Sequence, residues 1–253
     1  MQSSKFPTDA EVVIVGVGGI VGSMLAYWLT ELGQKNIVGL EKSTVIPSDI
    51  GSTAHASDFV YSTTHDKLSN WTTAFSRNFY EDNGFFLKKG GLEICRKDDD
   101  ACWEELKRKV ASGKAFGTNV SLISASEAKE KFPLLEEESI RGAMWDPDAG
   151  LVVPRSQDVV SFAVESAKEK GALTTYTDTP SVGVGIENGR LTGVNADKGT
   201  IKTDKVVIAS GIWGPLIGEM AGVPVPLSPV EHPLLFFGPL PQAQGAEDFL
   251  VYP

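Results

Sequence analysis

Cysteine is scarce in this chain of 253 residues, which contains only Cys95 and Cys102. Two cysteines are too few for a disulfide framework, and their spacing, with no histidine nearby, fits no zinc-binding pattern. We therefore expect two reduced thiols that pack as small hydrophobic side chains.

Long apolar runs are also missing. No segment approaches the roughly 20 apolar residues that a membrane-spanning helix needs. The first seven residues, MQSSKFP, lack both the apolar core of a secretory signal and the Arg-rich pattern of a transit peptide. The sequence therefore predicts no membrane span and a soluble intracellular protein. We expect the cytoplasm, and the mitochondrial matrix stays open as the alternative.

An excess of positive charge is absent, because the formal net charge is −10 and the acidic residues are scattered along the chain. A phosphate lattice would repel such a surface, which argues against a nucleic-acid or anionic-membrane partner. A hydrophobic content of 42% with 22% charged residues is typical of a globular protein. The length permits one large domain or two small ones.

The N-terminal segment has the pattern of a βαβ unit. Residues 11–15 are a short β-branched run typical of a strand buried on both faces. Apolar residues at helical spacing follow from 20 to 32, and Gly33 ends them. Residues 36–41 form the next apolar run. This order predicts two parallel strands joined by a right-handed helical crossover.

Later segments alternate between helical and extended patterns. We expect helices over residues 66–86, 98–116, 124–133, 154–170 and 213–221. We expect strands near residues 173–176, 181–186, 190–196 and 205–209. Asn188-Gly189 separates two of these strands and predicts a tight hairpin, because both turn positions need a positive φ. The proline-rich tail from Gly222 is typical of connections and edge strands.

The turn after the first strand reads Gly16-Val17-Gly18-Gly19-Ile20-Val21-Gly22. Glycines let the backbone approach a pyrophosphate, and the helix N-terminus offers free N–H groups with a partial positive charge. Glu41 ends the second strand, where its carboxylate can accept hydrogen bonds from ribose hydroxyls. The pattern favours a dinucleotide site; a tight structural turn is the alternative.

The glycine spacing in this turn is irregular. A regular G-x-G-x-x-G pattern from Gly16 places Val21 where the third glycine belongs, and Gly22 comes one residue late. We interpret this as a one-residue insertion around Gly18-Gly19, which either weakens or reshapes the phosphate cradle.

The hexad Gly51-Ser52-Thr53-Ala54-His55-Ala56, together with this turn, resembles the D-amino-acid-oxidase-type flavoprotein superfamily. The branch it resembles most is that of dimethylglycine oxidase, dimethylglycine dehydrogenase and sarcosine dehydrogenase. The likeness runs from about residue 11 to 237 and includes the segments 90–93, 149–151, 209–214 and 229–232. The resemblance implies an α/β fold, with a doubly wound, Rossmann-like FAD-binding domain interleaved with an incomplete antiparallel-sheet substrate domain.

The resemblance also implies a division of the chain. We expect residues 1–90 to form the FAD-binding βαβ portion and residues 91–150 to begin the substrate domain. Residues 151–221 would return to the FAD-binding domain, and residues 222–253 would begin further substrate-domain strands. Relatives continue beyond the position of Pro253, so we expect a fragment, a truncated product or one piece of a split enzyme.

FAD is the cofactor that the resemblance implies. The resemblance assigns FAD contacts to residues in five segments. The expected FAD-binding residues are Gly16, Gly18, Gly19, Ile20, Val21, Gly22, Glu41, Lys42, Ser52, Thr53, His55, Val182, Ala209, Gly211 and Trp213. For Val182 and Trp213, an ordinary packing role is the open alternative.

Two histidines carry more specific expectations. In the resembling branch the histidine of the hexad bonds covalently to the flavin 8α-methyl carbon, so His55 would be the attachment site, with a neutral imidazole as nucleophile. A non-covalent flavin contact and a purely structural cap remain alternatives. His232 aligns with a histidine that faces the substrate, or else it is a loop residue. His65 has no counterpart, and we expect it to be solvated.

The function implied is FAD-dependent oxidation of the CH–NH group of an N-methylated amino acid such as dimethylglycine or sarcosine. The partners would be this amine and an electron acceptor, either oxygen or an electron-transfer protein. Two alternatives stay open. One is a non-catalytic FAD-binding fragment or subunit; the other is a nicotinamide-dependent dehydrogenase, which the hexad and the Ala209-Ser210-Gly211-Ile212-Trp213 segment disfavour.

Overall fold

The computed structural model describes residues 6–231, 233 and 251–252. These residues form two compact units. Unit 1 contains the described residues through Ala56 and from Arg155 to residue 233, and unit 2 contains Ser57 to Pro154 with residues 251–252. Unit 2 is therefore inserted between two segments of unit 1, which is the interleaving expected from the sequence.

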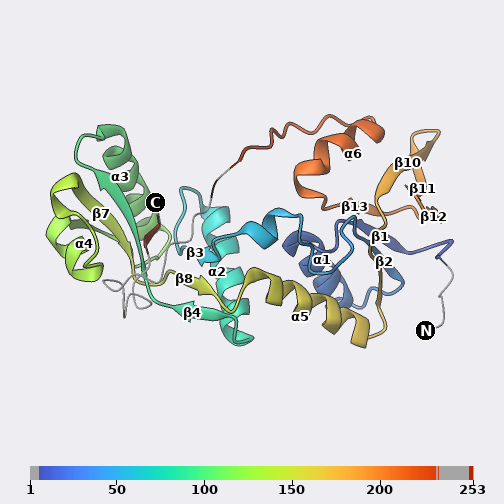
Figure 1. The fold of residues 1–253 in the computed structure, drawn as a ribbon, viewed down its shortest axis with the longest axis horizontal. Coiled ribbons are helices and arrows are strands. Elements are labelled where there is room, and N and C mark those ends of the chain that lie inside the picture. The colour runs from blue at the N-terminus through green and yellow to red at the C-terminus, as the bar shows by residue number, and fades with distance from the viewer. Residues whose placement is uncertain (1–5, 232, 234–250, 253) are drawn as a thin grey trace. The chain divides into compact units, whose positions relative to one another are not determined.

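A parallel sheet of four strands forms the centre of unit 1 (Figure 1). Its order is β13-β1-β2-β9, and every neighbouring pair is parallel. The strands are β1 (Val12–Val15), β2 (Ile37–Leu40), β9 (Leu173–Tyr176) and β13 (Val206–Ile208). The predicted βαβ unit is confirmed, with α1 (Ile20–Glu31) as its crossover.

The alternation of side chains along β1 explains why the sheet is covered on both faces. Val12 and Ile14 pack with α1 and with α5 (Ser156–Glu169). Val13 and Val15 point to the other face and pack against a three-stranded antiparallel sheet. A strand buried on both faces needs a continuous apolar run, and all four of these valine and isoleucine residues are buried.

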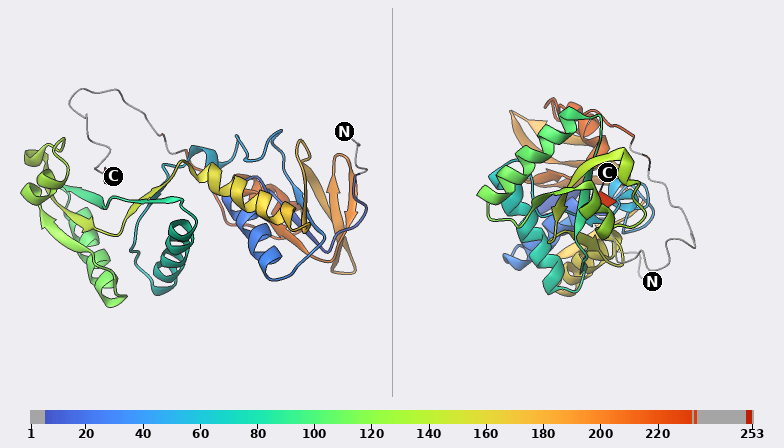
Figure 2. Two further views of the ribbon diagram at one scale, coloured as in Figure 1. Left: turned by 90° about the horizontal axis from the view of Figure 1, so that it is seen from below. Right: turned by 90° about the vertical axis from the view of Figure 1, so that its left-hand side faces the viewer.

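The second layer of unit 1 is a sheet and not a set of helices. Its strands, in the order β10-β11-β12, are β10 (Ser181–Glu187), β11 (Arg190–Ala196) and β12 (Gly199–Lys202). Asn188 and Gly189 have φ values of 49° and 74°, which confirms the predicted hairpin turn. Figure 2 shows α5 in yellow and α1 in blue beside the central strands, with the orange hairpin in the same unit.

The remaining elements of unit 1 lie near strand ends. They are the 3₁₀ turn η1 (Ser52–His55), the 3₁₀ turn η3 (Gly211–Trp213) and the short helix α6 (Gly214–Met220). Both turns lie within segments that the sequence singled out for cofactor binding.

Unit 2 contains two sheets. The first has the order β14-β5-β7-β6 and is antiparallel except for the parallel pair β14–β5. Its strands are β5 (Gly91–Arg96), β6 (Ser121–Ser124), β7 (Ile140–Asp146) and β14 (Val251–Tyr252). The second, β3-β8-β4, is antiparallel and consists of β3 (Phe59–Val60), β4 (Phe86–Lys88) and β8 (Gly150–Val152).

Three helices complete unit 2: α2 (Lys67–Asp82), α3 (Asp100–Ala115) and α4 (Ala125–Lys131); a 3₁₀ turn, η2, spans Glu137–Ser139. At the start of α4, the Ser124 hydroxyl and the Glu127 carboxylate form a reciprocal capping box. The helix expected to reach residue 86 ends at Asp82, and Phe86 begins β4 because it pairs with Val152.

Most strands of unit 2 escaped sequence prediction. They are short, and several show little alternation between apolar and polar residues because both faces of the sheet are covered. On one face, Cys95, Leu106 and Met144 are buried together between β5, α3 and β7. The unit boundaries fall near residues 56 and 154, whereas the sequence division was drawn at residues 90 and 150. That division concerns which segments bind cofactor and substrate, and it stays a prediction.

No helix in the described ranges is both long and apolar enough to cross a membrane. Within those same ranges, no group of His, Cys, Asp and Glu side chains could hold a metal ion.

Both cysteines are free thiols, as predicted. Burial in the core of unit 2 raises the pKa of the Cys95 thiol to about 12. Because the thiolate is the reactive form, we predict that iodoacetamide at pH 8 labels Cys95 in the native protein at least about 100-fold more slowly than Cys102. Mass spectrometry of peptides over a time course measures both rates. In denaturant the two rates should converge; comparable rates in the native protein would contradict the prediction.

Candidate functional site

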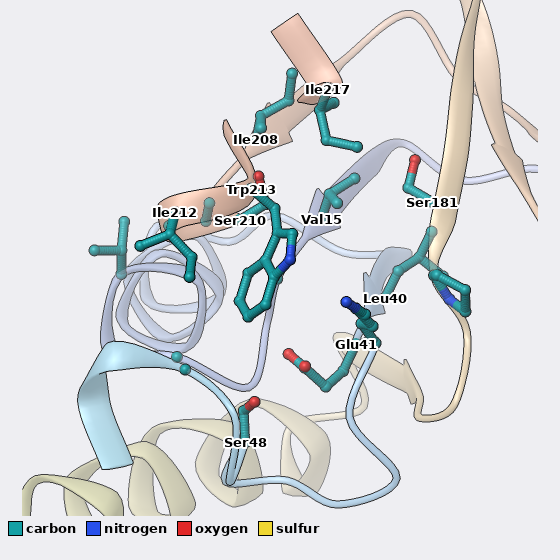
Figure 3. Close-up of a pocket in the computed structure, with 18 of the residues that line it drawn as sticks. Val15, Leu40, Glu41, Ser48, Ser181, Ile208, Ser210, Ile212, Trp213 and Ile217 are labelled. Carbon is teal, nitrogen blue, oxygen red and sulfur yellow. The ribbon is translucent and has the colours of Figure 1, made fainter. Parts of the chain in front are cut away.

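A cavity of 540 Å³ lies in unit 1 at the carboxyl ends of β1, β2 and β13. This edge of a parallel sheet is where α/β folds bind their ligands, and the volume is in the usual range for small-molecule sites. The residues expected from sequence that line it are Gly16, Gly19, Ile20, Val21, Glu41, Lys42, Ser52, Thr53, Ala209, Gly211 and Trp213. Four separate chain segments therefore meet at one site, which Figure 3 shows in part.

The glycine turn at this site is closely packed. Gly16 has a φ of +93°, and a Cβ there would lie 2.5 Å from the carbonyl oxygen of Ala209. A Cβ on Gly22 would lie 2.2 Å from the carbonyl oxygen of Gly16. Only glycine permits these approaches between the strand end and the helix.

The irregular glycine spacing reshapes the turn without displacing its third glycine. Gly22 lies against Gly16 and so brings the start of α1 close to the end of β1. The additional residue is accommodated within residues 17–19, where the Val17 side chain is buried against Gly39. The turn is therefore closely packed in the structure, and the effect of the additional residue on cofactor binding stays a prediction.

Glu41 fixes the turn through its carboxylate. It is buried, and its two oxygens accept hydrogen bonds from the backbone amides of Gly18 and Ser43, each at 2.9 Å. A carboxylate has about four acceptor sites, so two of them remain for ligand hydroxyls. Gly18 itself lies beneath Glu41 and does not line the cavity, because a Cβ there would meet Glu41 Oε2 at 2.5 Å.

Thr53 connects the hexad to the glycine turn. Its Oγ1 accepts a hydrogen bond from the backbone N–H of Ile20, the first residue of α1, at 3.0 Å. The N-cap residue, Gly19, provides no side-chain cap, and the first turn of α1 contains no acidic residue. The end of the helix that attracts anions therefore faces the cavity wall formed by Ser52 and Thr53.

Lys42 and Trp213 meet across the cavity. The Lys42 ammonium lies 4.6 Å from the centre of the Trp213 ring, a cation–π distance. Figure 3 shows the indole and the Glu41 carboxylate within the same cavity. The structure therefore assigns Trp213 a place in the site wall instead of an interior packing position, although its role in binding stays a prediction.

Four of the expected site residues do not line the cavity: Gly18, Gly22, His55 and Val182. His55 is exposed at the end of η1, its Nδ1 lies 3.0 Å from the carbonyl oxygen of Gly51, and its side chain does not line the cavity. Val182 is half exposed on β10, next to Ser181, which does line the cavity. His232 lies outside the described residues. His65, which was expected to be solvated, is about half exposed and lies 2.7 Å from Glu105 Oε1.

The structure adds polar residues that sequence reasoning missed. Ser181 and Ser210 line the cavity, and each has a buried hydroxyl oxygen without a hydrogen-bond partner in the described part of the chain. Buried hydroxyls are rarely left unpaired, so both are suited to contact a polar ligand. Ser210 lies in the Ala-Ser-Gly-Ile-Trp segment, so its position in the sequence could have identified it as a site residue. Nothing in the sequence marks Ser181 in this way.

These residues fit a dinucleotide. The glycine turn leaves room for a close backbone approach, the helix end suits a pyrophosphate, and Glu41 and the two serines offer groups for hydroxyls. Apolar side chains complete the wall: Ile208, Ile212, Leu216, Ile217 and Met220.

Substitution of Gly22 tests the packing of the turn. We predict that Gly22→Ala lowers the free energy of unfolding by about 1–3 kcal/mol, because the new methyl group overlaps the Gly16 carbonyl. Urea denaturation followed by circular dichroism measures the change. The matched control is Gly214→Ala, since Gly214 has helical dihedral angles and open space around it. Equal stability of the two variants would contradict the close approach.

Comparison with known proteins identifies the fold and its relatives. Residues 11–253 match the family model DAO, FAD dependent oxidoreductase. The chain is 28% identical over 243 residues to human mitochondrial sarcosine dehydrogenase, covering 91% of this chain and 26% of that protein. It is 30% identical over 242 residues to the mouse mitochondrial pyruvate dehydrogenase phosphatase regulatory subunit, with the same coverage.

A solved structure agrees with these matches. L-proline dehydrogenase from P. horikoshii superposes with a TM-score of 0.76 at 32% identity, over 86% of this chain and 57% of that one. The chain spans about a quarter of the length of the two curated relatives. Because the family model covers nearly the whole chain, and because the glycine turn, Glu41 and the hexad meet at one cavity, this chain belongs to the DAO family of FAD-dependent oxidoreductases.

Proposed function

We propose that the protein to which this chain belongs oxidises the CH–NH group of an N-methylated amino acid such as sarcosine or dimethylglycine. The observation that carries the proposal is the joining of the hexad to the glycine turn by the hydrogen bond from Ile20 N to Thr53 Oγ1. The similarity to human sarcosine dehydrogenase supports the substrate class. When bound, FAD would supply the hydride acceptor for the N-methyl carbon, and water would hydrolyse the iminium product.

The residues of unit 1 would hold the cofactor. Backbone amides at the start of α1 would bind the pyrophosphate, and Glu41 would accept hydrogen bonds from ribose hydroxyls. The Lys42–Trp213 pair and the Ser181 and Ser210 hydroxyls would add contacts in the same wall. Val182 would contact the cofactor through its backbone.

The segments between and after these residues would belong to the substrate domain, with residues 91–150 and 222–253 as its beginning. His232 would face the amine within that domain. The electron acceptor would be oxygen or an electron-transfer protein. The cytoplasm and the mitochondrial matrix both stay open as compartments; the two curated relatives are mitochondrial by name.

A second candidate function is that of a regulatory subunit that binds FAD without turnover. The specific observation in its favour is the similarity to a pyruvate dehydrogenase phosphatase regulatory subunit, which is as strong as the similarity to sarcosine dehydrogenase. The two candidates share the cofactor site and differ in whether an amine reduces the flavin.

Anaerobic titration distinguishes the two candidates. We expect sarcosine or dimethylglycine to bleach the flavin absorbance near 450 nm of the purified FAD-loaded protein, because hydride transfer removes the oxidised chromophore. Dithionite serves as the control, since it reduces any accessible flavin. Full bleaching by dithionite with no change by either amine would reject this substrate class and favour the regulatory subunit.

The contribution of Glu41 to cofactor affinity is measurable without turnover. We predict that Glu41→Gln weakens FAD binding by about 10-fold, because a neutral amide is a weaker acceptor than a carboxylate for ribose hydroxyls. Quenching of FAD fluorescence on binding gives the dissociation constant. Glu187→Gln, at an exposed glutamate on β10, is the matched control. Unchanged affinity in Glu41→Gln would remove this carboxylate from the proposed contacts.

His55 is proposed as the covalent attachment site of the flavin, with a non-covalent contact as the alternative. After acid precipitation of the FAD-loaded protein, we expect the yellow colour to stay in the pellet, and His55→Ala to release it into the supernatant. His65→Ala, at the exposed histidine of unit 2, should retain it. Colour released from the unsubstituted protein would refute the bond.

A further inference from the structure

A second cavity, also of 540 Å³, lies within unit 2. One of its walls is a face of α2, which contributes Lys67, Asn70, Trp71, Ala74 and Arg77. These positions are separated by three or four residues and therefore lie on the same side of the helix. Trp71 is 63% exposed, so the aromatic ring stands at the rim.

The other walls come from two turns. Residues 115–118 are the last residue of α3 and the turn after it, and they include Phe116 and Thr118. Asp148 lies in the turn between β7 and β8. Ser62 completes the lining, and both its hydroxyl and its amide are already bound to the Asp146 carboxylate at 2.6 Å. The walls are thus fixed by secondary structure and by a buried hydrogen-bond pair.

Asn70 presents an unmatched acceptor in this wall. Its side chain is buried, with a relative exposure of 6%, and its amide nitrogen donates to the carbonyl oxygens of Thr64 and Asp66 and to Thr64 Oγ1. Two of these partners are carbonyl oxygens, which cannot donate, so the orientation of the amide is determined. Asn70 Oδ1 consequently has no donor among the described residues.

Two further polar atoms in the same lining are unmatched. The buried Nε of Arg77 makes no hydrogen bond in the described part of the chain; the Glu81 carboxylate, at 3.8 Å, forms an ion pair with it that is too long for one. Thr118 Oγ1 is also buried and without a partner in that part. Folded proteins leave few such groups unpaired, and here the three residues that carry them all line one cavity.

The charges around the cavity favour an anionic group. Asp148 lies 2.5 Å from Lys88 and accepts from Asn119, and the Lys88 hydrogen bond is the main reason that the pKa of Asp148 is lowered. Glu81 pairs with Arg77 at 3.8 Å, yet Lys67, Arg77 and Lys88 together carry three positive charges against the two carboxylates of Asp148 and Glu81, so positive charge is in excess around the cavity. A ligand that matches the unpaired groups therefore carries an anion for Arg77 and a donor for Asn70 Oδ1.

We propose that this cavity binds a small carboxylic acid that also carries a hydroxyl or amino donor, as hydroxy acids and amino acids do. The carboxylate accepts from the Arg77 guanidinium, and the donor satisfies Asn70 Oδ1. Neither the chemistry at the glycine turn nor the identity of the oxidised amine enters this assignment, because every residue involved lies in unit 2.

Isothermal titration calorimetry of the full chain with glycolate, glycine and acetate tests the proposal. We expect saturable binding of glycolate or glycine, with a dissociation constant on the order of 1 mM. Acetate, which lacks the donor, should bind at least about 5-fold more weakly because Asn70 Oδ1 stays unpaired. Absence of saturable binding by both glycolate and glycine would overturn the proposal, as would equal affinity for acetate.

Variants locate the binding to this cavity. Arg77→Gln should weaken glycolate binding by at least about 10-fold, and Arg77→Lys should restore part of it by keeping the charge. Arg96→Gln, at an exposed arginine of the same unit, should bind as the unsubstituted protein does. Circular dichroism shows which variants are folded. If Arg77→Gln is unfolded, the test becomes the glycolate affinity of Arg77→Lys compared with that of Arg96→Lys. Undiminished binding in the folded Arg77 variants would overturn the assignment.

Discussion

The cofactor site depends on one close contact, between the carbonyl oxygen of Gly16 and the backbone of Gly22. It brings the N-terminus of α1 to the carboxyl end of β1, so that the helix dipole and the strand end face the same cavity. Any side chain at Gly22 would separate them. The buried Glu41 carboxylate then holds the intervening turn by accepting from the Gly18 and Ser43 amides.

The additional residue in the turn shows how such a site tolerates variation. The requirement is a short distance and not a fixed spacing in sequence: the third glycine must touch the strand end, and Gly22 does so one position late. The surplus length goes into a segment where Val17 fills the space above Gly39, since Gly39 has no side chain. The hydrogen bond from Ile20 to Thr53 then links the reshaped turn to the hexad some thirty residues later.

The two cavities differ in the way they combine polar and apolar groups. The one in unit 1 joins backbone amides, a carboxylate and two unpaired serine hydroxyls to an apolar wall, which suits a long ligand with distinct parts. The cavity in unit 2 combines the buried amide of Asn70 and the guanidinium of Arg77 with the aromatic rings of Trp71 and Phe116. This combination suits a small ligand with two polar ends. Family membership accounts for the first, and the second follows from the side chains of this chain alone.

The sequence by itself determined the βαβ unit, the hairpin at Asn188-Gly189, the flavin-type glycine turn and the hexad, because each is a local pattern whose steric or hydrogen-bonding reason lies within a few residues. It did not yield most strands of unit 2, since partners such as Cys95 and Gly142 are brought together only by the fold. Nor did it show that Ser181 and Ser210 line one cavity, or that His55 lies at the exposed end of its turn. It also did not show that Asn70 Oδ1 and Arg77 Nε have no hydrogen-bond partner in the described part of the chain. Those are consequences of which side chains meet across distant segments, and only tertiary structure decides that.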